Sequence, residues 1–135
     1  MDQNQQQGFT ERDLVLSPMS YCWITDETKG NINCFVGPHK SNLDGKTDKP
    51  VVFDTRQKKF VNCELAQAVQ MFKIAPEGWY MILKNPAEKQ PKDGGNQGFE
   101  KLDIGKKIMY PGPVSFPLWP GQMQLEENNL KKDHL

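Results

Sequence analysis

The chain has few of the residues that build disulfide frameworks and metal sites. It contains three cysteines, Cys22, Cys34 and Cys63, and no CxxC pair. An odd cysteine count is a poor disulfide framework, and the missing CxxC pairs remove the usual zinc motif. The two histidines, His39 and His134, form neither an HxH nor an HExxH pattern. We therefore predict no metal site, and free thiols in a reducing compartment.

Catalytic and nucleotide-binding motifs are also missing from the sequence. No serine lies in a GxSxG context, which is the setting of a nucleophilic serine in many hydrolases. Residues 93–98 (DGGNQG) superficially suggest a phosphate loop, but the GK[ST] ending and the flanking strand and helix are absent. We predict no catalytic, cofactor-binding or metal-binding residues, and therefore a protein that is not an enzyme.

The sequence has no excess of charge and no long apolar run. Lys plus Arg number 17 and Asp plus Glu number 17, so the net charge is zero. Affinity for phosphate backbones comes from a basic excess, so we expect no nucleic-acid partner. No stretch approaches the roughly 20 apolar residues of a membrane span, and MDQNQQQGF has no basic start or apolar signal core. We expect no membrane span and a cytoplasmic location.

Short segments rich in aromatic and β-branched residues make up most of the apolar content. Such segments, bounded by turn residues, are typical of strands. They lie at residues 14–16, 21–25, 31–36, 51–53, 60–61, 79–83 and 102–110. Residues 111–122 contain four prolines, which precludes a helix and suits an extended segment at a sheet edge.

The remaining segments are polar or ambiguous. Residues 1–10 are predicted to be a flexible Gln-rich arm and residues 125–135 a charged tail. Residues 39–50 and 87–98 are expected to be mobile loops because they hold little apolar surface. Residues 64–72 fit helical spacing and strand alternation almost equally well, and extended structure is favoured.

Two stretches of the chain match at a constant offset. LSPMSYCWI and IAPEGWYMI align Pro18 with Pro76 and Ile24 with Ile82, and 76 − 18 and 82 − 24 both give 58. Each copy later reaches a Gly-Pro pair, with extra residues inserted in the second copy. A fixed period of this size is typical of arrayed modules, each of which buries little surface by itself. We predict two modules, at residues 11–70 and 71–124.

This order of motifs resembles the repeat of the major vault protein. The matching stretches are SPMSYCWITDETKGNINCFVGPHKS, MFKIAPEGWYMILKNPA and KLDIGKKIMYPGPVSFPLWPGQ, so the resemblance covers roughly residues 14–123. It implies a wall built from tandem small antiparallel β-domains, which in related proteins can precede a stomatin/prohibitin-like domain. The chain departs from that family in having two repeats, not a long array, and in its long polar loops.

Together these observations predict an all-β fold of two small related antiparallel β-modules in tandem with long polar loops. The predicted function is a non-enzymatic structural module that packs into a vault-like shell or a virion assembled in the cytoplasm. Its partners would be copies of itself or neighbouring shell proteins. The alternative is a small ligand- or peptide-binding β-domain. The candidate interface residues are Phe35, Phe116, Leu118 and Trp119, of which some are expected at contacts between sub-units or chains because exposed strand edges and apolar anchors favour association.

Overall fold

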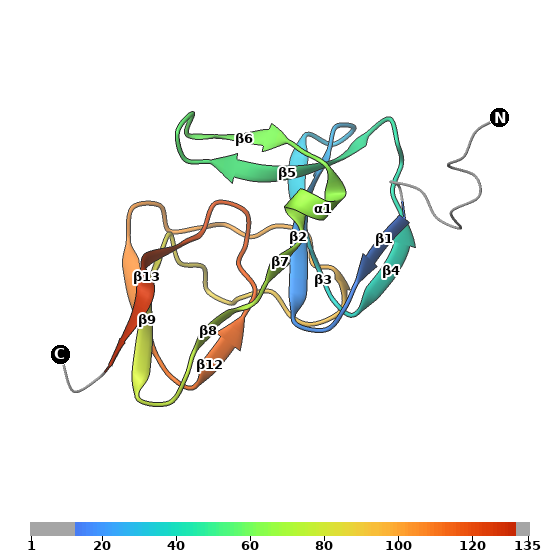
Figure 1. The fold of residues 1–135 in the computed structure, drawn as a ribbon. Coiled ribbons are helices and arrows are strands. Elements are labelled where there is room, and N and C mark those ends of the chain that lie inside the picture. Colours follow the sequence, from blue (N-terminus) through green and yellow to red (C-terminus); the bar gives the residue numbers. More distant parts are fainter. Residues whose placement is uncertain (1–12, 132–135) are drawn as a thin grey trace.

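The computed structural model describes residues 13–131, with side chains to Leu125. Within that range the chain forms short strands and one four-residue helix, which confirms the predicted all-β class (Figure 1). The elements are β1 (Asp13–Leu16), β2 (Ser20–Asp26), β3 (Asn31–Val36), β4 (His39–Asn42), β5 (Asp48–Asp54), β6 (Lys59–Asn62), α1 (Leu65–Ala68), β7 (Gln70–Met71), β8 (Lys73–Ala75), β9 (Trp79–Lys84), β10 (Gly95–Asn96), β11 (Lys107–Pro111), β12 (Val114–Phe116) and β13 (Met123–Lys131).

The strands form four sheets in which every pairing is antiparallel. The largest has the order β10-β3-β2-β5-β6, with β7 pairing the start of β2. A second sheet has the order β11-β9-β13, and two-stranded ribbons are made by β1 with β4 and by β8 with β12. In Figure 1 the sheet of β9 and the ribbon of β8 and β12 occupy one side of the molecule, and β1 and β4 the other.

The first half of the chain builds a corner between a ribbon and a hairpin. After β1 the chain turns, and the Ser20 amide donates to the Ser17 carbonyl at 3.3 Å. Met19 has φ 69° at the third position of this turn, and Pro18 fills the second position, which its fixed φ favours. The hairpin β2–β3 follows, and then the Gly37 amide donates to the Ser20 carbonyl at 2.9 Å. β4 can then return beside β1.

The second half repeats this corner with the same hydrogen bonds. The Trp79 amide donates to the Pro76 carbonyl at 3.0 Å, and the Gly112 amide donates to the Trp79 carbonyl at 2.7 Å. Gly78, with φ 87°, takes the place of Met19. We call β1–β7 together with α1 the first unit, and β8, β9, β11, β12 and β13 the second unit.

The structural correspondence between the units differs by one residue from the offset seen in the sequence. Ser20 corresponds to Trp79 and Tyr21 to Tyr80 by their pairings, so that 79 − 20 and 80 − 21 both give 59. The sequence offset of 58 does not carry over to the structure because it aligns Pro18 with Pro76. Pro18 occupies the second position of its turn, whereas Pro76 occupies the first.

The third strand of each unit also corresponds. Val51 of β5 pairs with Trp23, and Leu125 of β13 pairs with Ile82. Each unit then pairs a second time with its central strand, near the start of that strand: β7 with β2, and the end of β13 with β9. In the first unit β6, which pairs with β5, and α1 lie between these two pairings, from residue 51 to residue 70. In the second unit only a register shift of β13 separates residues 125 and 130.

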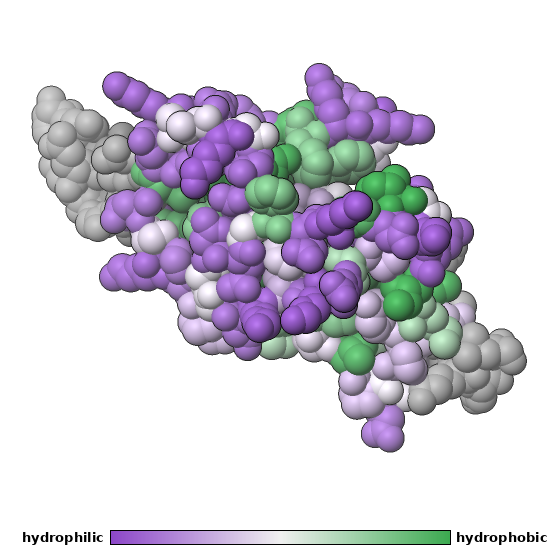
Figure 2. Space-filling view, turned by 180° about the vertical axis from the view of Figure 1, so that it is seen from behind, coloured by the Kyte–Doolittle hydropathy of each residue, from purple (hydrophilic) through white to green (hydrophobic). Residues whose placement is uncertain are grey.

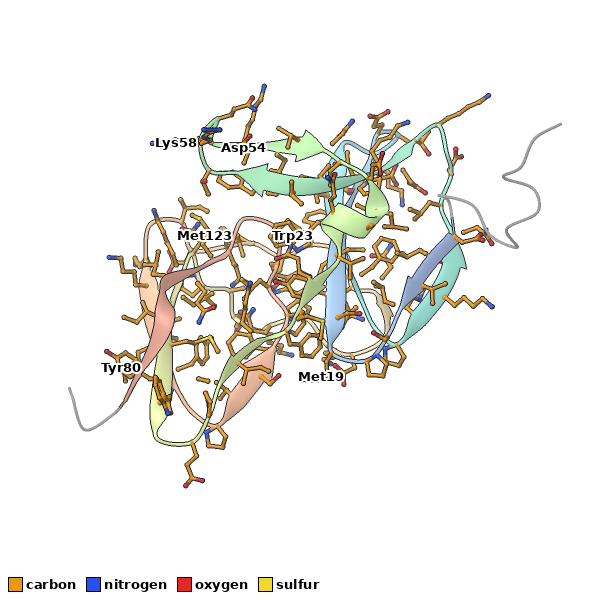
Figure 3. All side chains as sticks on the ribbon, viewed as in Figure 1. Met19, Trp23, Asp54, Lys58, Tyr80 and Met123 are labelled. Atoms are coloured by element: carbon orange, nitrogen blue, oxygen red, sulfur yellow. The ribbon has the colours of Figure 1, made fainter. Side chains whose placement is uncertain are left out.

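Two hydrophobic clusters lie on opposite faces of β2. Side chains alternate along a strand, so Tyr21 and Trp23 enter one cluster and Cys22 and Ile24 the other. The larger cluster draws on both units and contains Tyr21, Trp23, Cys34, Val36, Val51, Phe72, Leu83, Leu118 and Trp119. Figure 3 shows Trp23 on the side of β2 that faces the second unit. The smaller cluster, which includes Leu14, Leu16 and Leu43, lies within the first unit.

Several polar segments are more regular than the sequence predicts. Residues 39–50 hold β4 and the start of β5, because backbone pairing with β1 and β2 needs no apolar side chains. Extended structure is favoured for residues 64–72, but Leu65–Ala68 form α1 and only Gln70–Met71 form a strand, β7. The predicted charged tail is strand as far as Lys131. The Gln-rich arm, residues 1–10, lies outside the described residues.

The connection from β9 to β11 is also tied to the fold. The sequence predicts a mobile loop at residues 87–98, but β10 lies inside this range and pairs with β3.

The predicted boundary between the two modules, between residues 70 and 71, falls inside β7. This strand pairs with β2 of the first unit.

Candidate functional site

Leu118 and Trp119 lie where the two units meet. Leu118 is 2% exposed and Trp119 is 6% exposed, and both belong to the larger cluster. The Trp23 indole N–H donates to the Leu118 carbonyl at 2.9 Å, and the Cys34 thiol lies 3.5 Å from the same oxygen. A chain segment predicted to supply contacts thus joins the second unit to β2 and β3 of the first.

Phe35 and Phe116 are half-buried, so part of each side chain is exposed to solvent. Phe35 packs against the smaller cluster, and its ring lies 5.5 Å from that of His39. Phe116 packs against the larger cluster, with its ring edge-on to Tyr110 at 4.9 Å. A contact between chains through these two half-buried rings stays a prediction.

A buried amide network holds the segment around Trp119. The Gln122 side-chain oxygen accepts from the Trp119 amide at 2.7 Å and from the Gln90 amide group at 2.8 Å. The Gln122 NH₂ group donates to the Asn85 carbonyl at 3.2 Å, and the Asn85 side chain donates to the Gly121 carbonyl at 2.8 Å. Since buried polar groups are costly unless they are hydrogen-bonded, this network fixes the geometry of the segment.

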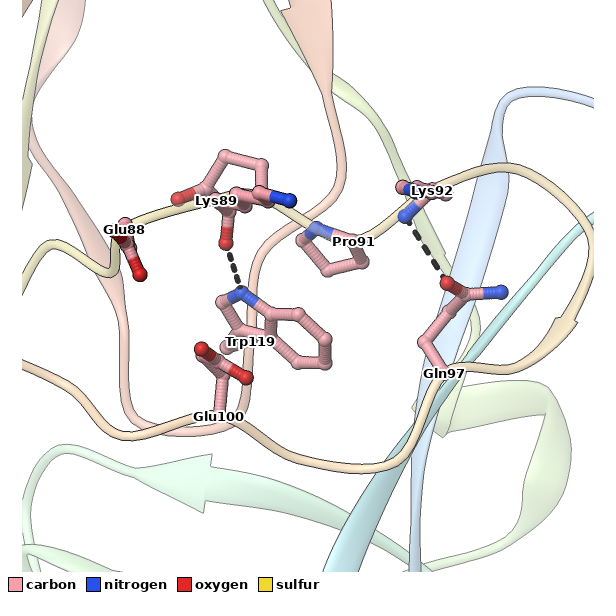
Figure 4. A pocket seen from close by; sticks show the side chains of 8 residues that line it. Glu88, Lys89, Pro91, Lys92, Gln97, Glu100 and Trp119 are labelled. Atoms are coloured by element: carbon pink, nitrogen blue, oxygen red, sulfur yellow. Dashed lines mark hydrogen bonds between the residues drawn. The ribbon is translucent and has the colours of Figure 1, made fainter.

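A shallow depression opens beside Trp119, between residues 88–92 and residues 97–100 (Figure 4). The Trp119 indole N–H donates to the Lys89 carbonyl at 2.6 Å, and the Lys92 amide donates to the Gln97 side chain at 3.2 Å. The lining residues are Glu88, Lys89, Gln90, Pro91, Lys92, Gln97, Glu100 and Trp119. Ligand pockets are mostly apolar and enclosed, whereas this one is open and carries charges of both signs.

The cysteines are free, and their environment disfavours the thiolate. Burial raises the pKa of Cys22 to about 12, with a smaller contribution from Cys63. Burial also raises the pKa of the Cys34 thiol, and it raises that of Cys63, which is only partly covered. The thiolate is the nucleophile and the metal ligand, so these thiols are poorly suited to either role.

Further searches for reactive or membrane-spanning features concern the described residues alone. No group of three or more His, Cys, Asp or Glu side chains within residues 13–131 is placed to hold a metal ion. In the same part of the chain, no helix has the length and apolar character needed to cross a bilayer.

His39, the one histidine among the described residues, makes a 2.8 Å hydrogen bond with the Ser41 hydroxyl.

The structure shows one repeated surface feature that the sequence did not reveal. Val15 and Ile74 occupy the same position in the two ribbons, since 74 − 15 gives the structural offset of 59, and they are 62% and 49% exposed. Their sequence neighbours Leu14, Leu16 and Ala75 are buried. The alternation of buried and exposed positions in a strand could have identified Val15 of DLVL as exposed. Its match with Ile74 is not visible in the sequence alignment, because that alignment uses an offset of 58. On the face drawn in Figure 2, hydrophobic surface forms separate patches among polar residues.

Comparison of the chain with family models, curated proteins and solved structures found no match.

Proposed function

We propose that this protein is a non-enzymatic structural module that assembles side by side with copies of itself. The observation that carries this proposal is the repeated unit with an exposed apolar side chain at the same position of each ribbon, Val15 in β1 and Ile74 in β8. A position that is exposed and apolar in both units suits a contact that each unit makes with its neighbour in the same way.

The ribbons that carry these residues support the proposal. Within the described residues each ribbon is a sheet of two strands. A two-stranded sheet is marginal by itself, so packing against a neighbouring unit would stabilise it. The net charge of zero also lets copies approach closely.

The resemblance to the major vault protein repeat supports a particular setting. A wall of tandem β-domains would make neighbouring shell proteins the partners, within a vault-like particle or a virion built in the cytoplasm. Tight lateral packing is what such a wall requires of each unit.

The test compares three variants of equal net charge by sedimentation velocity. Val15→Glu and Ile74→Glu each place a carboxylate on one ribbon, facing Lys40 or Ser115 on the paired strand, so that the fold tolerates the change. Ile104→Glu is the control. Ile104 is 72% exposed, but it lies in the long connection between β9 and β11, whereas only a short turn joins the corresponding strands β2 and β3 of the first unit. We expect the two ribbon variants to associate at least tenfold more weakly than the control, with unchanged circular dichroism. Equal association of all three variants would contradict the proposal.

The ligand-binding alternative has one observation in its favour, the depression beside Trp119. In that case the protein would sediment as a monomer, and a ligand bound there would change the fluorescence of Trp119.

A further inference from the structure

The outer edges of β3 and β11 differ, although the two strands correspond. The outer edge of β3 is covered by β10, with Gly95 opposite Val36 and Asn96 opposite Phe35. The Gln97 amide donates to the Cys34 carbonyl at 2.8 Å, and the Cys34 amide donates to the Gly98 carbonyl at 2.8 Å. The covering segment comes from the connection between β9 and β11, so the second unit protects an edge of the first.

The corresponding edge of the second unit carries no strand. β11 ends its sheet, and within residues 13–131 no strand pairs with its outer side. The pairings Cys34 with Trp23 and Met109 with Ile82 make Met109 the counterpart of Cys34. The Met109 N–H and C=O therefore point away from β9, as those of Cys34 point toward β10.

The side chains on this bare edge are also apolar. Ile108 is 40% exposed and Met109 is 46% exposed. Proteins usually protect exposed edges with charges, prolines or a covering segment. Here Lys107 and Pro111 stand only at the ends of the strand.

We propose that the outer edge of β11 binds an extended segment of a partner chain by antiparallel strand addition. The segment has the chemistry of residues 92–100 (KDGGNQGFE), with Gly94 and Gly95 toward one end and Glu100 at the other. It is carried by a neighbouring shell protein, because in a copy of this chain residues 92–100 already cover β3. This inference rests on the proposed function and names the edge at which such a neighbour binds.

Register and charge indicate this occupant. Transferring the register of β10 onto β11 puts Gly95 opposite Pro111 and Asn96 opposite Tyr110. Gln97 and Gly98, which both bond to Cys34, would then lie beside Met109. The segment would continue from there toward Lys107 and Lys106, so that its acidic end, Glu100, lies near these two lysines. Lys106 lies 3.8 Å from Asp103, but both side chains are more than half exposed, so that pair contributes little and leaves Lys106 able to turn toward a partner. Main-chain hydrogen bonds give affinity in this binding mode, and side chains give specificity.

The test uses the full chain, ¹⁵N-labelled, and an end-capped synthetic peptide of residues 92–100. We expect the peptide to shift the amide resonances of residues 107–110 and 112 in heteronuclear correlation spectra; Pro111 has no amide N–H. A peptide with Gln97→Pro is the matched control, because it lacks the N–H that would reach the Met109 carbonyl. The control peptide should bind at least tenfold more weakly.

A protein variant tests the companion hydrogen bond, from the Met109 N–H to the Gly98 carbonyl of the peptide. Met109→Pro removes this outward N–H, and proline is tolerated on an edge strand where the replaced N–H faced outward. This variant should bind the unaltered peptide at least tenfold more weakly; if it does not fold, the Gln97→Pro peptide still decides. The absence of shifts in residues 107–112, or equal binding of the two peptides, would overturn the inference. Assembly that persists without peptide binding would leave the proposed function standing.

Discussion

Gly37 and Gly112 show at the residue scale why the two corners are alike. A Cβ atom on Gly37 would overlap the Ser17 carbonyl oxygen, and one on Gly112 would overlap the Pro76 carbonyl oxygen. Each of these oxygens accepts the hydrogen bond of its turn, from Ser20 or Trp79, so it cannot retreat without breaking that bond. Close approach of backbone to backbone requires glycine at both corners.

Gly112→Ala should therefore lower the free energy of unfolding by about 1–3 kcal/mol or more, because the new methyl group meets backbone atoms that cannot move aside. Urea denaturation followed by tryptophan fluorescence measures the change. Gly30→Asn is the control: Gly30 has φ 78°, a Cβ atom there would meet nothing within 4 Å, and asparagine tolerates this conformation. Equal midpoints for Gly112→Ala and the unaltered chain would show that the close approach is wrong.

Trp119 can be tested at the same scale. Trp119→Ala should destabilise the fold by about 3–5 kcal/mol, as large-to-small changes in a core do, because the ring is buried between the units and its N–H is bonded to Lys89. Phe116→Ala should cost less, since that ring is only half-buried. Denaturation and sizing together decide the role of Trp119. A variant with unchanged stability and lost assembly would assign Trp119 to a contact between chains.

The sequence identifies the large apolar residues of the segment around Trp119, but not the amide side chains that hold this segment in place. Leu118 and Trp119 are identifiable because they are large apolar residues in a proline-rich segment. Asn85, Gln90 and Gln122 are not, because amide side chains in polar loops look like surface residues. Their burial depends on chain segments brought together from far apart in the sequence.

At the element scale, strands with local signals are predictable and strands made by distant pairing are not. The hairpin β2–β3 combines aromatic and β-branched residues with the turn at Gly30, so the sequence predicts both of its strands. β4 (HKSN) and the end of β13 have polar sequences without a strand pattern. They are extended because β1 and β9 offer them backbone partners.

The connection between β9 and β11 gives the element-scale prediction. Deleting residues 88–97 should destabilise the protein, because the deletion removes the Lys89 and Gln90 hydrogen bonds and uncovers the edge of β3. Replacing the exposed turn at residues 55–58 by Asn-Gly is the control, since a short hairpin turn tolerates this change. Thermal unfolding should show a clear loss for the deletion and little change for the control. The opposite order would mean that residues 88–97 are an independent loop.

At the scale of the whole molecule, the two units form one body. Tyr21 and Trp23 share a cluster with Leu83 and Leu118, and the Trp23 indole is bonded across the junction. This contact buries the faces of the two units that lie toward each other. What remains for neighbours is the outer surface: the two ribbons with Val15 and Ile74, and the edge of β11.

Sedimentation equilibrium of the unaltered chain, over a wide range of concentrations, tests side-by-side assembly most directly. If the units pack laterally, the weight-average mass should rise with concentration well above the 15.4 kDa of one chain, and electron micrographs of the heavier species should show regularly repeated units. A mass that stays at 15.4 kDa across the whole range, with no ordered particles in the images, would contradict the proposal that this protein is built for assembly.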